Sequence, residues 1–495
     1  MEHLLQTFTL KPSKLQIGTT MSSSSTKMAA VDKGIMDDKI SYIGVIPVLL
    51  DISFSFYASM FTSPFRGQKG AITYRRAVFY AALREVISGF SVAEGQKFTP
   101  NTDKVYRSIA KSKGWKAHTV DFKNGGKGHW LGHSNAKYVM LYIHGGGYIS
   151  AATPGHLKYQ FALQKQLRKL GHDFSILSLS YTLAPKAVYP TQINQAAAAL
   201  RYLVFDQKRD PSTIIIAGDS AGGNLVTAIL SHIAHPHPQL APLDLGGRLG
   251  GAVMISPWIS FSTSDPSFKE NAKSDILTTS GLDRASNTYI GPGGRHDNYT
   301  EPVRAPPQWW APVTDVVDEI LIWGGGGEIL IDSIRRFAAN LKAGFQLAEQ
   351  KDSAPVEAKT TTEHANGEVK TTTEHANGDS KTTTEHANGD AKTTTEHANG
   401  EAEKHDSVSA TPPFGTPRES PSAEPILPDD SKPAPPDAEE KALDSQRKER
   451  AKFVESPRMA HEEMILDYIL RMRGKKKRHG ARAIEVWMDN LMKEG

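Results

Sequence analysis

Ser220 is the residue of this chain whose setting best suits nucleophilic chemistry. It lies in the motif Gly-Asp-Ser-Ala-Gly-Gly at 218–223, after the apolar run 213–217 and before the helix-like run 224–230. A serine on such a sharp strand-to-helix turn needs very small neighbours, because the strand and the helix pass close to each other. The glycines two positions before and two positions after Ser220 meet this need. The pattern therefore predicts a nucleophilic serine.

A serine hydroxyl needs a base to remove its proton, and a histidine acting as that base needs a carboxylate to orient it. In one class of serine enzymes, the order along the chain is serine, acid, histidine. Glu328 follows the apolar run 319–323 and four glycines, and Asp332 competes with it four residues later. We favour Glu328, because it lies in the loop at the end of the strand, whereas Asp332 falls in the following helix.

His461 is the candidate base. It lies far beyond Glu328 in the chain until the segment 346–449 is set aside. The remaining spacing fits one helix, one strand and their loops. A single histidine is more often structural, so the order and the spacing carry this interpretation. They place His461 after the next strand, beside the acid.

A second glycine-rich loop comes earlier in the chain. The motif His-Gly-Gly-Gly at 144–147 directly follows the apolar run 138–143. Without side chains, the backbone N–H groups of such a loop can approach a carbonyl oxygen that becomes negative during ester cleavage. We expect the amides of Gly145, Gly146 and Ala221 to form this oxyanion hole.

Strand-like and helix-like segments alternate from residue 138 onward. Apolar runs of strand length lie at 138–143, 174–179, 213–217, 251–255 and 319–323, with helical patterns between them. This alternation predicts an α/β fold with a mostly parallel sheet that helices cover on both faces. The candidate residues then fall at the carboxyl ends of the strands, where such sheets bind their ligands. The core spans residues 136–345 and resumes at 450–495.

The segments outside this core differ in composition. Residues 1–39 are polar and predict a disordered leader that does not resemble a secretory signal. Residues 346–449 predict a disordered insert, because four copies of Lys-Thr-Thr-Thr-Glu-His-Ala-Asn-Gly recur there every 11 residues with one apolar residue each. We expect no coiled coil and no preorganised metal site from the repeat histidines. Deleting 350–445 is expected to leave the activity near normal.

Residues 40–135 predict a helical cap and the first edge strands, with a helix over 71–92 and a strand over 117–122. The apolar segment 40–61 is interrupted by Pro47 and Asp51. Three interpretations stay open for it: a membrane span, a helix lying on a membrane, and a cover over the active site. The location is accordingly cytoplasmic or membrane-associated, and the endoplasmic reticulum fits the second case.

Composition limits the other classes of function. The net charge of +4 over 495 residues gives no reason to expect nucleic acid as a partner, and the basic cluster at 471–478 is expected to be a solvated helix end. The chain has no cysteine, which excludes disulfides, thiolate catalysis and cysteine-bound zinc. No metal or other cofactor is expected.

Four motifs together resemble the hormone-sensitive-lipase-like branch of the α/β-hydrolases. They are His-Gly-Gly-Gly at 144–147, Tyr-Thr-Leu-Ala-Pro at 181–185, Gly-Asp-Ser-Ala-Gly-Gly at 218–223 and Ser-Pro-Trp at 256–258. The resemblance implies an α/β-hydrolase fold and a carboxylic ester hydrolase that forms an acyl-enzyme.

Within this branch, the chain is most similar to fungal steryl acetyl hydrolases and arylacetamide deacetylases, which suggests small acyl groups on a hydrophobic alcohol as substrates. An acyltransferase, a lactonase and a small-molecule binding protein on the same fold are the alternatives. The family usually has aspartate at the acid position, so Glu328 is a departure from its pattern.

Overall fold

The computed structural model describes residues 42–65, 70–353, 359–365, 368–374, 380–387, 390–397, 402–403, 438–470 and 479–494. The chain forms two units: residues up to 345 with those after 430, and residues 346–430. The predicted leader at 1–39 and the basic cluster at 471–478 lie outside the described residues.

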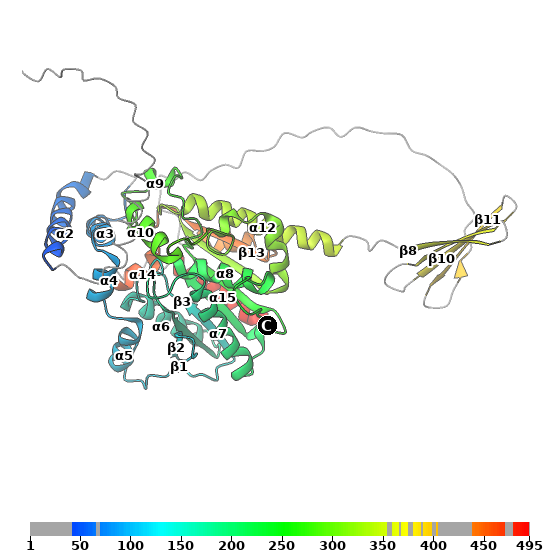
Figure 1. Ribbon diagram of the computed structural model, residues 1–495, viewed down its shortest axis with the longest axis horizontal. Coiled ribbons are helices and arrows are strands. Elements are labelled where there is room, and N and C mark those ends of the chain that lie inside the picture. The colour runs from blue at the N-terminus through cyan, green and yellow to red at the C-terminus, as the bar shows by residue number, and fades with distance from the viewer. Residues whose placement is uncertain are drawn as a thin grey trace, which may run out of the picture. The chain divides into compact units, whose positions relative to one another are not determined.

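An eight-stranded sheet forms the centre of the larger unit, in the order β1-β2-β4-β3-β5-β6-β7-β13 (Figure 1). Its strands are β1 (Thr119–Asp121), β2 (Lys127–Leu131), β3 (Tyr138–Ile143), β4 (Phe174–Ser180), β5 (Ile214–Asp219), β6 (Leu249–Ile255), β7 (Val317–Gly325) and β13 (Ala451–Ser456). The pairs from β4 to β13 are parallel, and only the β1–β2 and β2–β4 pairs of this sheet are antiparallel. The predicted α/β fold with a mostly parallel sheet is confirmed.

The central strands are apolar throughout because both faces of the sheet are covered. Every residue of β3 is buried, and its side chains alternate between two cores. Val139 and Leu141 belong to the core with α7 (Thr191–Arg201), α8 (Ala221–Ala234) and α12 (Ile331–Ser353). Met140 belongs to the opposite core, with α6 (Pro154–Lys169) and α15 (His479–Glu494). The period-two pattern of a strand thus fills both cores from one segment.

Helices before the sheet form the N-terminal cap, as the sequence predicts. They are α2 (Tyr42–Thr62), α3 (Tyr74–Gly89), α4 (Val92–Phe98) and α5 (Thr102–Lys113). Tyr80 of α3 packs in a small core with Ala460 and with Leu466 of α14 (Glu463–Ile469). The shorter helices α9 (Ser267–Glu270), α10 (Thr279–Ile290) and α11 (Pro307–Trp310) lie between β6 and β7 in the chain.

The described residues of the region 346–449 include short strands. The repeats form a separate antiparallel sheet in the order β12-β11-β10-β9-β8, with strands β8 (Lys359–Ala365), β9 (Glu368–Glu374), β10 (Ser380–Ala387), β11 (Asp390–His397) and β12 (Ala402–Glu403). The register places threonines opposite threonines, for example Thr382 opposite Thr373. Threonine is β-branched and Asn-Gly is a hairpin turn pair, so each unit combines a strand former with a turn.

The limits of the expected insert also differ from the structure. Helix α12 continues to Ser353, and α13 spans Ala438–Ser445, so both ends of the range 346–449 are helical. Leu443 of α13 is buried in the core of the larger unit. The insert that leaves this core intact is therefore shorter than predicted.

Candidate active site

The turn at Ser220 has the strained geometry that its motif predicts. Ser220 lies between β5 and α8 with φ 49° and ψ −117°, a conformation that costs a non-glycine residue about 1–3 kcal/mol. Its N–H donates to the carbonyl of Ile255 at 2.9 Å, and its carbonyl accepts from the N–H of Trp258 at 3.0 Å. A Cβ atom on Gly222 would lie 2.0 Å from the carbonyl oxygen of Ile143. Only glycine therefore permits the close approach of α8 to β3.

The glycine loop after β3 supplies backbone amides, but not all the expected ones. The N–H of Gly145 donates to Asp219 Oδ2 at 2.8 Å, so it is engaged within the protein. The expectation that Gly145 donates to an oxyanion therefore conflicts with this structure. Gly146 and Gly147 have positive φ angles of 104° and 60°, and no described residue accepts a hydrogen bond from their amides. The amide of Ala221 begins α8, where first-turn N–H groups have no partner within the helix.

Glu328 and His461 are in direct contact. His461 Nδ1 lies 2.8 Å from Glu328 Oε2, and both side chains are buried. The other oxygen, Oε1, accepts from Ser256 Oγ at 3.0 Å and from the Gly325 N–H at 2.6 Å. The competitor Asp332 accepts instead from the Ser267 N–H at 2.9 Å. Of the two carboxylates considered, the structure brings Glu328 to the histidine.

Asp275 supports both loops, and the sequence analysis did not identify it. Its buried carboxylate accepts the N–H of His461 at 3.1 Å and the N–H of Ile329 at 2.7 Å. Arg84 of the cap donates to the Asp275 carbonyl oxygen at 2.6 Å. No motif marks Asp275, because its role depends on contacts with residues 54 and 186 positions away.

The electrostatic setting favours a charged pair between acid and base. Burial raises the pKa of Glu328, while hydrogen bonding to His461 opposes this rise. Burial alone lowers the pKa of His461, but the hydrogen bonds and charges of Glu328 and Glu462 outweigh it and hold that pKa well above its usual value. A carboxylate that stabilises an imidazolium is what transfer of a proton from serine requires.

A second buried cluster lies beside the histidine and was also missed. His156 Nε2 lies 3.0 Å from Asp219 Oδ2 and 3.9 Å from Glu462 Oε2. Because Asp219 precedes Ser220 and Glu462 follows His461, this cluster draws the two loops together. The Tyr142 hydroxyl donates to Asp219 Oδ1 at 2.6 Å. Only Asp219 lies in a sequence motif, because the cluster joins three distant segments.

The donor atoms of His156, Asp219 and Glu462 lie within 4.8 Å of one another, close enough to hold a metal ion. They are, however, engaged among themselves. The Thr153 N–H donates to His156 Nδ1 at 3.1 Å, so Nε2 carries the proton and donates to Asp219. A protonated nitrogen cannot bind a metal. We therefore assign the cluster to hydrogen bonding.

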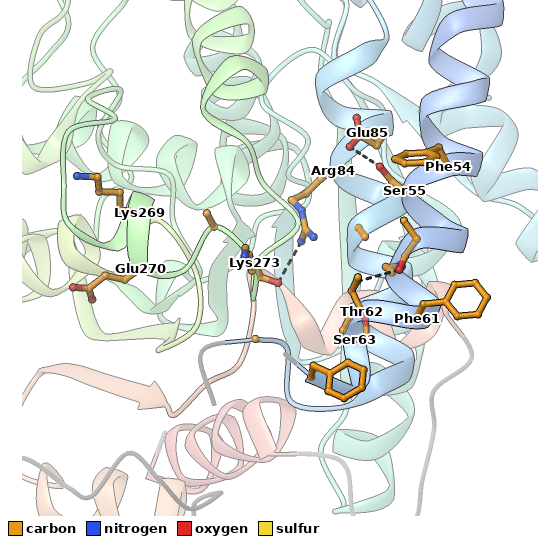
Figure 2. Close-up of a pocket in the computed structure, with 17 residues that line it drawn as sticks. Phe54, Ser55, Phe61, Thr62, Ser63, Arg84, Glu85, Lys269, Glu270 and Lys273 are labelled. Carbon is orange, nitrogen blue, oxygen red and sulfur yellow. Dashed lines mark hydrogen bonds between the residues drawn. The ribbon is translucent and has the colours of Figure 1, made fainter. Parts of the chain in front are cut away.

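A separate open groove, with a volume of about 1190 Å³, lies between the cap and the segment 269–273 (Figure 2). Phe54 and Phe61 line it from α2, while Lys269 and Lys273 line it from the opposite side. Neither Ser220, Glu328 nor His461 belongs to its lining. The groove is thus distinct from the candidate active site.

Comparison with known proteins agrees with this geometry. A family model described as the alpha/beta hydrolase fold matches residues 140–356. An acetyl-hydrolase from Streptomyces hygroscopicus is 30% identical over 227 residues, which cover 43% of this chain and 68% of that protein. The chain therefore belongs to the α/β-hydrolase fold family.

Two further relatives refine the class. A carboxylesterase from Mycobacterium tuberculosis is 33% identical over 31% of this chain and 44% of its own length. An arylacetamide deacetylase from Bos taurus is 31% identical over 30% of this chain and 37% of its own length, so the match spans less than half of either relative. With the acetyl-hydrolase, they support the class of carboxylic ester hydrolases.

Proposed function

We propose that this chain cleaves carboxylic esters through an acyl-enzyme, with Ser220 as nucleophile, His461 as base and Glu328 as the acid that orients it. The observation that carries this proposal is the 2.8 Å contact between His461 Nδ1 and the buried Glu328 carboxylate. The strained turn of Ser220 lies at the same carboxyl edge of the sheet.

The proposed reaction has two steps. Ser220 Oγ attacks the ester carbonyl carbon and passes its proton to His461 Nε2, while Glu328 holds Nδ1–H and balances the new charge. The amides of Gly146, Gly147 and Ala221 bind the oxyanion. The alcohol leaves with the proton from Nε2, and water then releases the acyl group by the same route.

The substrate class we propose is a small acyl group, such as acetyl, on a hydrophobic alcohol. The names of the acetyl-hydrolase and the arylacetamide deacetylase support the small acyl group. Acyl transfer to another alcohol and opening of a lactone use the same acyl-enzyme, so a panel of acceptors and lactones separates them from hydrolysis.

Replacing the nucleophile tests the proposal. Ser220→Ala is expected to lower kcat/KM for aryl acetates by at least about 1,000-fold, because the acyl-enzyme can no longer form. The matched control is Ser262→Ala, since Ser262 is exposed and its hydroxyl bonds only to Ser264 among the described residues. Equal rates for Ser220→Ala and the parent chain would refute the mechanism.

We also propose that α2 attaches the chain to a membrane surface. By length and composition alone, the helix at Gly44–Phe65 suffices to cross a membrane, and little of it is buried. Its exposed face carries a stripe of large apolar residues spaced by three or four positions: Ile46, Leu50, Phe54, Tyr57, Phe61 and Phe65. This spacing places them along one side of the helix.

The opposite side of α2 favours a helix that lies in the membrane plane. Ser55 Oγ donates to Glu85 at 2.8 Å (Figure 2). Phe56 packs edge-on against Phe79, so α2 is bound to α3 (Figure 1). Val48 lies so close to Gly89 that a Cβ atom there would be 2.6 Å from it. A spanning helix would have to leave these contacts, whereas an in-plane helix keeps them.

A further inference from the structure

Glu462 is a buried residue beside His461 that has no role in the proposed reaction. It directly follows His461 and has φ 49° and ψ 32°, a left-handed conformation that favours glycine. Its side chain is only 9% exposed. A buried carboxyl group on a strained backbone is unfavourable by itself, so its contacts must explain it.

Those contacts place the carboxyl group on the reactive side of the histidine. Glu462 Oε1 lies 3.5 Å from His461 Nε2, the nitrogen that must accept the proton of Ser220. A Cβ atom on Gly145 would lie 2.6 Å from the same oxygen, so the carboxyl group also lies against the glycine loop. His461 therefore has a carboxyl group beside each of its ring nitrogens. No hydrogen bond joins Ser220 and His461 within the described part of the chain.

We propose that Glu462 is a second carboxyl partner of His461 that stabilises its imidazolium form through Nε2 and so delays its conversion to the neutral base as pH rises. Glu462 acts through the histidine and is a positioning residue. This inference deepens the proposed function and rests on it.

The groups around Glu462 allow it to take both charge states. Asp219 and His156 face it from β5 and α6, and the hydroxyl of Ser256 accepts its backbone N–H at 3.3 Å. Tyr142 and Tyr181 are the other titratable groups near it. Burial and the charge of Asp219 raise the pKa of Glu462 to about 7, although hydrogen bonding to His461 opposes the rise. Near neutral pH, Glu462 can thus hold or release a proton.

The pH dependence of kcat/KM tests the proposal. An opposite charge within about 4–6 Å shifts a pKa by about 1–3 units. Glu462→Gln removes that charge, so the acidic limb of the profile is expected to move about 1 pH unit or more toward lower pH. At pH 8, where Glu462 is mostly ionised, the variant is expected to hydrolyse aryl acetates about 10-fold faster, relative to its own plateau, than the parent chain does.

Glu463→Gln is the matched control. Glu463 is the adjacent buried glutamate, but it pairs with Arg76 at 3.1 Å and accepts from the Tyr80 hydroxyl at 3.2 Å. Its loss is expected to lower Tm and leave the acidic limb in place. Glu462→Gly is a second test variant in case Glu462→Gln does not fold. Glycine adopts φ 49° without strain, and the substitution also removes the carboxyl group. The same limb in Glu462→Gly and the parent chain would overturn the proposal.

A direct titration separates this proposal from the proposed function. In a Ser220→Ala background, the ring ¹⁵N signals of labelled histidine report the pKa of His461 without turnover, and His461→Gln assigns them. Glu462→Gln is expected to lower that pKa whether or not any ester is hydrolysed. If Glu462→Gln leaves the pKa of His461 unchanged, the role of Glu462 is refuted. If Glu462→Gln lowers that pKa but the parent chain hydrolyses no ester, only the proposed esterase function is refuted.

Discussion

Buried glutamates gather around β13 and the loop that follows it. Glu439, Glu462 and Glu463 are all buried, and burial is the first reason that the pKa of each is raised to about 7. Each has partners that limit the cost of burial. Glu463 pairs with Arg76, whereas Glu439 accepts a hydrogen bond from the neutral hydroxyl of Ser456. Glu439 therefore has the weaker compensation for its charge.

Glu439 should make stability depend on pH in a predictable direction. The pKa of Glu439 is about 7 in the folded chain, and its ordinary value of 4.5 applies to the unfolded chain. At pH values between these two, the folded state therefore binds more protons than the unfolded state. This contribution is most favourable below about pH 4.5 and is lost as pH rises through about 7, at a cost of about 3 kcal/mol. Glu439→Gln is thus expected to gain Tm relative to the parent chain between pH 5 and pH 8.

Thermal unfolding across this pH range measures the effect. The control is Glu440→Gln, the next residue of α13, which is partly exposed and pairs with Arg482 at 2.5 Å. Its Tm difference from the parent chain is expected to stay small and nearly constant. A Tm difference for Glu439→Gln that does not change with pH would contradict this account of Glu439.

At the scale of single residues, motifs identify the candidate site residues whose positions depend on local sequence spacing. Ser220 is marked by its turn, and Glu328 by its place after a strand. Asp219 belongs to the same motif as Ser220, yet its bond to the Gly145 amide reverses the expected use of that amide. Asp275 and Glu462 acquire their roles through contacts between distant segments, which one sequence does not reveal.

At the scale of elements, α13 changes which part of the insert is dispensable. Leu443 is 4% exposed, and Gln446 just after the helix donates to the Phe453 carbonyl of β13 at 2.8 Å. The charged stretch around 438–445 conceals this helix, because few of its residues are apolar. Deleting 350–445 would remove it along with the repeats.

Two replacements should separate α13 from the repeats. We expect residues 354–437 to be replaceable by a flexible linker of about 20 residues, with Tm and aryl acetate hydrolysis near those of the parent chain. Extending the replacement to residue 445 removes Leu443 from the core, which costs about 2–5 kcal/mol, so Tm should fall by at least about 5 °C. If the shorter replacement unfolds the protein, the repeats belong to its folding unit.

Other elements were predictable to different degrees. The strands β3, β5 and β6 are buried on both faces and give continuous apolar runs. Strand β2 was missed because it reads Lys-Gly-His-Trp-Leu, with glycine and histidine where β formers are usual. It forms because its backbone pairs with β4 on one side and β1 on the other. Tertiary pairing thus overrides its weak local preference.

At the scale of the whole molecule, the cap and the active site form one connected structure. Arg76 of α3 pairs with Glu463 directly after the candidate base loop, and Arg84 donates to the carbonyl of Asp275. The same Asp275 accepts the backbone N–H of His461. A membrane that holds α2 would therefore orient the cap, and through it the sheet edge where the proposed active site lies.

Vesicle binding tests whether α2 makes this attachment. Leu50, Phe54 and Phe61 are 64%, 74% and 78% exposed, so burying them in lipid should contribute about 1.5–3 kcal/mol each. The triple replacement by serine is expected to weaken flotation with phosphatidylcholine vesicles at least about 100-fold. Phe205→Ser with Leu170→Ser, which alters exposed apolar residues elsewhere, should leave binding intact.

Because α2 stays packed on α3, alkaline carbonate should release the parent chain from vesicles. Retention after that wash would instead indicate a spanning helix that has left α3.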